Sequence, residues 1–203
     1  ADLATTSDQV TDSMSAMGVG IDDLQGYLDV IVTTNNKANT TAADLMDAFI
    51  GCGGAARAAG MNYKETSTAL GILANNGIKG SEAGTALNSM LVRISTKDVA
   101  QKAFKDLGVA VYDSSGEMRN MRDILVDLNG AMAGMTQEQK NSYMSAIAGT
   151  NYYSQFGYLL DGVKEGVNGS ASAWDELAGA IDNSTGALDA ICLLYTSDAA
   201  DEA

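Results

Sequence analysis

The chain has 203 residues, with 26 acidic against 12 basic side chains and neither histidine nor proline. The missing histidine excludes a Ser-His-Asp triad, a Cys-His pair and a histidine-ligated metal. A net charge of −14 argues against binding nucleic acid by neutralising its phosphates, so no sequence-specific nucleic-acid binding is expected. No apolar run approaches the roughly 20 residues of a membrane span.

Helices are expected throughout, because the strongest helix breaker is missing and 22 glycines are left to end them. Apolar side chains recur at helical spacing in successive segments along the chain. These segments are Ile21–Val32, Leu45–Cys52, Ala69–Leu73, Leu87–Ile94, Ala100–Leu107, Met121–Leu128, Tyr143–Ile147, Tyr153–Leu160 and Trp174–Ile181.

Side chains that accept hydrogen bonds from a first helical turn mark the predicted helix starts. They are Thr41, Asn62, Ser81, Thr96, Thr136 and Thr150. Thr136 with Gln139 forms a capping box, in which each side chain bonds to the other residue's main-chain N–H. Asn75-Asn76-Gly77 and Gly108 are stop signals, since asparagine and glycine accept a left-handed backbone.

Residues 109–120 differ from the rest of the chain. Val109-Ala110-Val111-Tyr112 is rich in β-branched and aromatic side chains, and Asp113-Ser114-Ser115-Gly116 is a turn signal. We therefore predict one small β-hairpin within an otherwise all-α fold. The short, glycine-ended helices should fold back into a compact multi-helix bundle, since no apolar heptad persists long enough for a coiled coil.

Apart from Arg57, small residues occupy positions 51–60 and should let another helix approach closely. Within them, Gly51-Cys52-Gly53-Gly54-Ala55-Ala56 fits the loose dinucleotide pattern G-x-G-x-x-A. That site requires a preceding strand, whereas the residues before Gly51 have helical spacing. Helix packing is the favoured interpretation, with Cys52 as a buried structural thiol.

Two further patterns bear on possible chemistry. Asp113 to Glu117 is similar to a calcium loop, but its glycine comes too early, so a plain turn is favoured. The many carboxylates leave open an enzyme that uses a carboxylate pair, although acids spread over helices usually form a solvated face. No catalytic, cofactor-binding or metal-binding residue is assigned, and no cofactor is expected. The 10 methionines are read as core filling, with an adaptable interaction surface as the lesser alternative.

Several motifs in order resemble the phage tail tape measure proteins, in the minor tail protein family with a TP901-like core region. The main one is Ala69-Leu70-Gly71-Ile72-Leu73-Ala74-Asn75-Asn76-Gly77-Ile78-Lys79-Gly80-Ser81-Glu82-Ala83-Gly84-Thr85-Ala86-Leu87. The others are Ala4–Val10, Asp106–Val109, Tyr112–Arg119, Met135–Gln139 and Ile147–Thr150. Together they cover nearly all of the chain up to about Ala190.

The resemblance implies a structural, non-enzymatic protein of a long-tailed phage or prophage virion. Such proteins set tail length during assembly in the host cytoplasm, occupy the lumen of the tail tube and leave ahead of the DNA. The implied partners are other copies of the chain, the tail tube protein, tail assembly chaperones and baseplate or distal tail proteins. The alternative is a helical interaction module of a bacterial secretion or adaptor system.

The sequence predicts two unequal parts. Residues 1–190 form the helical core region, an internal fragment of a longer protein. Residues 191–203, with Cys192-Leu193-Leu194-Tyr195-Thr196-Ser197, resemble a translated sequencing adapter and break the family pattern, as in a metagenomic assembly. A ruler should be a long rod, so we expect the compact region to lie beside the ruler and not within it.

Overall fold

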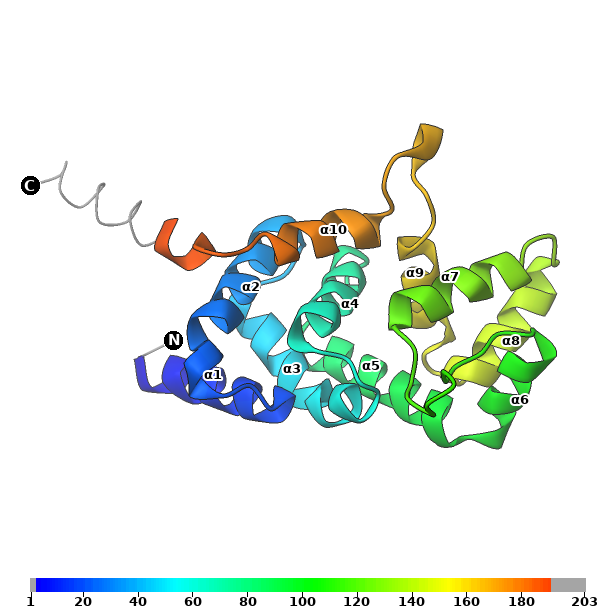
Figure 1. The fold of residues 1–203 in the computed structure, drawn as a ribbon, viewed down its shortest axis with the longest axis horizontal. Coiled ribbons are helices and arrows are strands. Elements are labelled where there is room, and N and C mark those ends of the chain that lie inside the picture. The colour runs from blue at the N-terminus through cyan, green and yellow to red at the C-terminus, as the bar shows by residue number, and fades with distance from the viewer. Residues whose placement is uncertain (1–2, 191–203) are drawn as a thin grey trace, which may run out of the picture.

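In the computed structural model, which describes residues 3–190, helices account for all of the regular secondary structure (Figure 1). The prediction of an all-α fold is confirmed. The α-helices are α1 (Leu3–Met17), α2 (Leu24–Lys37), α3 (Ala42–Ala58), α4 (Tyr63–Asn75), α5 (Gly80–Thr96), α6 (Asp98–Asp106), α7 (Met121–Ala131), α8 (Gln137–Ala148), α9 (Tyr153–Gly162) and α10 (Ala173–Asp182). Short 3-10 turns lie at Ile21–Asp23 and Val167–Gly169.

Local capping explains several helix starts. The Thr41 hydroxyl accepts the N–H of Asp44 at 3.0 Å, and the Asn62 side chain accepts the N–H of Glu65 at 2.9 Å. Thr136 and Gln139 form both bonds of the predicted capping box. These three starts are therefore confirmed.

Three other starts were misplaced. α5 begins at Gly80, one residue before the predicted Ser81, and α9 begins at Tyr153, three residues after Thr150. Thr96 ends α5 instead of beginning α6, because its hydroxyl donates to the Val92 carbonyl oxygen at 2.7 Å within the helix. A threonine in the last turn thus resembled an N-cap in sequence.

The predicted β-hairpin is wrong. Within residues 3–190 the segment 109–120 contains no strand, and a single antiparallel bridge joins Tyr112 and Met118. The two ends of the segment instead form hydrogen bonds that end one helix and begin the next. The N–H of Val109 bonds to the Phe104 carbonyl oxygen and closes α6, while the Asn120 side chain caps α7. Too few residues are left between them for a stable ladder.

The helices form two groups, which the long α5 connects (Figure 1). The first group contains α1 to α5 with α10, and the second contains α6 to α9. The amino-terminal part of α5 packs against α3, and its other end packs against α6 and α8. One continuous core of buried apolar side chains runs through both groups.

Glycines allow α3 to approach both of its neighbours closely. A Cβ at Gly53 would lie 2.7 Å from the main chain of Ala16 in α1. A Cβ at Gly84 in α5 would lie 2.5 Å from the Ala48 carbonyl oxygen in α3. The prediction that the small residues beginning at Gly51 admit a close helix is therefore confirmed. No helix within residues 3–190 is long and apolar enough to cross a membrane.

The last helix, α10, returns to the first group and lies across α2 and α4 (Figure 1). Trp174 at its start joins the main core. Leu177 and Ile181 instead form a small separate cluster with Val30 of α2. α10 is therefore attached through Trp174 in the main core and through this small second cluster, and polar bonds supplement both.

Candidate functional site

The dinucleotide-like pattern lies inside α3 and not at a strand-to-helix turn. Cys52 is fully buried there, and this burial raises the pKa of its thiol to about 12. A thiol with such a pKa is almost entirely protonated at neutral pH and is a poor nucleophile. The interpretation of this run as helix packing with a structural thiol is confirmed.

The calcium-like loop directs its acid onto its own main chain. One carboxylate oxygen of Asp113 accepts the N–H of Ser115 at 2.8 Å, the Ser115 hydroxyl at 2.6 Å and the N–H of Glu117 at 3.1 Å. The Ser115 hydroxyl, followed by these N–H groups, lowers the pKa of Asp113. The turn interpretation holds, and no group of three or more acidic or cysteine side chains in the described residues is placed to hold a metal ion.

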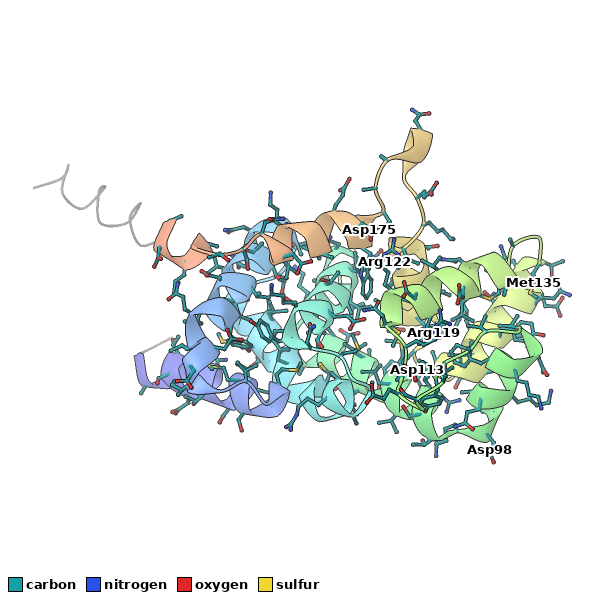
Figure 2. The ribbon with its side chains drawn as sticks, in the orientation of Figure 1. Asp98, Asp113, Arg119, Arg122, Met135 and Asp175 are labelled. Carbon is teal, nitrogen blue, oxygen red and sulfur yellow. The ribbon has the colours of Figure 1, made fainter. Side chains whose placement is uncertain are left out.

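A polar junction joins α4, α7 and α10. The Glu65 carboxylate accepts the N–H of Met121 at 2.8 Å, at the start of α7. The Arg122 guanidinium donates to both carboxylate oxygens of Asp175, at 2.5 Å and 2.7 Å. Figure 2 shows Arg122 and Asp175 together where the first turns of α7 and α10 meet. The junction links the two helical groups at their surface.

Electrostatics favour the charged forms of the Arg122–Asp175 pair. The hydrogen bond from Arg122 is the largest cause that lowers the pKa of Asp175, and the Ser172 hydroxyl adds to it. Glu65 differs, because its burial raises its pKa, opposed in part by the N–H of Met121. The sequence contained one signal for the junction: Arg122 lies in the first turn of a helix, where a cation is disfavoured without an anionic partner.

A second polar contact ties the end of the described chain to α2. The Asp29 carboxylate is buried and accepts the N–H groups of Gly186 and Leu188, each at 2.9 Å. Asp29 lies on the buried face of α2 in the structure. The apolar spacing within Ile21–Val32 does not place position 29 on that face, so the sequence carried no signal for this contact.

A groove lies between α7, α8 and α9 and has a volume of about 430 Å³. Met132, Met144 and Leu160 contribute apolar surface to it, and Lys140 and Lys164 lie among its polar residues. Its one carboxylate, Asp161, is paired with Lys164 at 2.5 Å. The groove therefore does not supply the carboxylate pair of the enzyme hypothesis.

These contacts describe a helical scaffold in which the capping, turn-forming and junction side chains named above hold the helices in place. A family model for the phage-related minor tail proteins matches residues 1–149, and the chain belongs to that family. This agrees with the resemblance that its sequence motifs indicated.

Two curated relatives of the chain are named as tape measure proteins, one of them as a probable one. The chain is 33% identical over 187 residues to the tape measure protein of Pneumococcus phage Dp-1, covering 92% of this chain and 16% of that protein. It is 29% identical over 155 residues to the probable tape measure protein of Escherichia phage P2, covering 75% of this chain and 19% of that protein. The chain thus spans less than a fifth of either relative. No solved structure gives a significant match.

Proposed function

We propose that this chain is a folded region of a phage tape measure protein that sets tail length during assembly and leaves the tail tube ahead of the DNA. The similarity to two tape measure proteins supports this role over the secretion or adaptor module. The role is structural and not enzymatic. Its proposed place is the tail tube lumen, after assembly in the host cytoplasm.

One contact supports the further proposal that this region is not itself the ruler. Asp29 and Leu188 lie 159 residues apart in sequence, yet they are joined by a hydrogen bond. At 1.5 Å per residue, a continuous helix of that length would separate them by roughly 240 Å. A region whose distant segments meet in this way adds little length per residue to a tail.

The proposed partners follow from this role. They are other copies of the chain, the tail tube protein, tail assembly chaperones and baseplate or distal tail proteins. Residues 1–190 carry 23 acidic and 12 basic side chains, and this net charge of −11 supports passage beside DNA without adhesion to its phosphates. We assign this role to residues 1–190. The proposed adapter-derived part, 191–203, lies outside the described residues, and resequencing the source DNA across the junction tests it.

In-frame deletions in the parent phage test the ruler proposal. Removal of residues 3–190 should abolish assembly or DNA injection without a proportional change in tail length. The matched control removes an equal number of residues from another part of the parent protein that carries long helical periodicity, and it should shorten tails by about 1.5 Å per residue. Electron micrographs in which the first deletion also shortens tails in proportion would overturn the proposal.

A further inference from the structure

The loop between α9 and α10 contains an asparagine without a side-chain partner. Asn168 is exposed, and its side chain forms no hydrogen bond with any residue from 3 to 190. Its φ of 62° is the only positive value among the described non-glycine residues. Gly169 follows, and a Cβ there would have no heavy atom within 4 Å. The loop projects from the body of the molecule (Figure 1).

The chain has two other Asn-Gly pairs, and both asparagines are held in place. Asn76 donates its side-chain N–H to the Ile72 carbonyl oxygen at 2.9 Å, at the end of α4. Asn129 in α7 donates to the Leu160 carbonyl oxygen at 2.6 Å. The first of these residues is exposed like Asn168, so anchoring, and not exposure, distinguishes Asn168 from both.

The main-chain N–H groups of the glycines that follow these asparagines also differ in how firmly they are hydrogen-bonded. The N–H of Gly77 bonds to the Ala74 carbonyl oxygen at 3.0 Å, and Gly130 lies within α7. The N–H of Gly169 makes only a long bond of 3.3 Å to Gly166. Both atoms that must meet for a ring to close are thus least restrained at position 168.

We propose that Asn168-Gly169 is a site of spontaneous deamidation in the folded protein. The main-chain nitrogen of Gly169 attacks Cγ of Asn168, so an N–Cγ bond forms, the Cγ–Nδ2 bond breaks and ammonia leaves with the proton from the attacking nitrogen. Water then opens the five-membered imide at either carbonyl and leaves an aspartyl or an isoaspartyl residue. No electron is transferred, and solvent water is the only co-reactant.

The product changes the loop in two ways. A negative charge appears three positions after Glu165 in the sequence, in a segment whose cation, Lys164, is already paired with Asp161. The isoaspartyl form also adds one carbon to the main chain of the connection to α10. Because the released ammonia is lost to solvent and the amide is not restored, the fraction of modified molecules rises with the age of the folded protein.

Peptide mass mapping of the intact chain tests the proposal. The folded protein is incubated in mildly alkaline buffer made with heavy-oxygen water, which labels only carboxylates formed during the incubation. Position 168 should acquire label several-fold faster than positions 76 and 129. In denaturant the three rates should converge, because all three asparagines precede glycine and the fold no longer restrains any of them.

The variant Asn168→Gln is the matched control, because its longer side chain cannot close the five-membered ring. It should remove the labelled peptide at 168 and leave labelling at the other two sites unchanged. Equal labelling at the three sites in the folded protein would overturn the proposal. A preference for position 168 that persists undiminished in denaturant would also overturn it, since sequence and not structure would then set the rate.

Discussion

Arg122 and Asp175 form a two-bonded ion pair, at 2.5 Å and 2.7 Å, between helices that begin 52 residues apart in the sequence. Each side chain lies in the first turn of its helix. The carboxylate suits the positive end of α10, and it also compensates the arginine at the positive end of α7. One pair thus stabilises two helix starts and fastens α10 to the second helical group.

The variant Asp175→Asn should lower the free energy of unfolding by about 1 kcal/mol, since the pair is partly exposed and two-bonded. Urea denaturation measures the change. The matched control is Asp161→Asn, which breaks a more exposed pair within one turn and should cost less than about 0.5 kcal/mol. Equal effects of the two variants would contradict a special role for the junction.

The contribution of Asp175 should depend on pH in a defined direction. Its pKa is lowered in the folded state, so the stabilisation is fully present above the ordinary aspartate pKa of about 3.9. It is lost as the pH falls below that value and through the folded pKa. The stability difference between the parent chain and Asp175→Asn should therefore be constant near neutrality and shrink below about pH 4. A difference that grows on acidification would contradict the assignment.

Close packing of α3 against α5 leads to a prediction at Gly84. A Cβ there would meet the Ala48 carbonyl oxygen at 2.5 Å, and main chain cannot move aside as a flexible side chain can. Gly84→Ala should destabilise the protein by about 1–3 kcal/mol in thermal or urea unfolding. Gly54→Ala, in α3 with open space around the new methyl group, should stabilise it by about 0.5–1 kcal/mol. The prediction fails if both variants change stability in the same direction.

Sequence patterns predicted those features of the fold that depend on residues close together in the chain, such as helix caps. Thr41 and Thr136 cap helices through bonds to residues three positions away, so the signal and its partner lie within one turn. The β-hairpin prediction failed because Val109 and Asn120 are recruited by the helices on either side, and local β propensity does not register that competition.

Long-range contacts were beyond a single sequence. Glu65 lies in the first turn of α4, yet its carboxylate accepts a hydrogen bond from the N–H of Met121, 56 residues away. Arg122, a cation in the first turn of a helix, was an anomaly visible in sequence, but its partner depends on how the helices pack. Asp29 carried no local signal at all. Tertiary packing, and not propensity, therefore decides the polar junctions of this fold.

Burial of Cys52 predicts a protected thiol. Its pKa near 12 leaves almost no thiolate at pH 8, and full burial blocks reagent access. Alkylation read by peptide mapping should leave Cys52 unmodified in the folded chain and modify it completely in denaturant. Peptide mapping separates this residue from Cys192. Rapid labelling of Cys52 in the folded protein would show that α3 is less tightly packed than described.

The buried carboxylate of Asp29 leads to the most local prediction. In Asp29→Ala the N–H groups of Gly186 and Leu188 lose their acceptor, and that loss should cost about 1–3 kcal/mol. Hydrogen exchange should accelerate at these two amides, while the amides of α3 keep their protection until the whole chain unfolds. Asp22→Ala is the matched control, because its side chain is exposed and it should leave exchange at both amides unchanged. If Asp29→Ala leaves exchange at Gly186 and Leu188 unchanged, the carboxylate does not hold this segment against α2, and the support it gives to a folded-back region is removed.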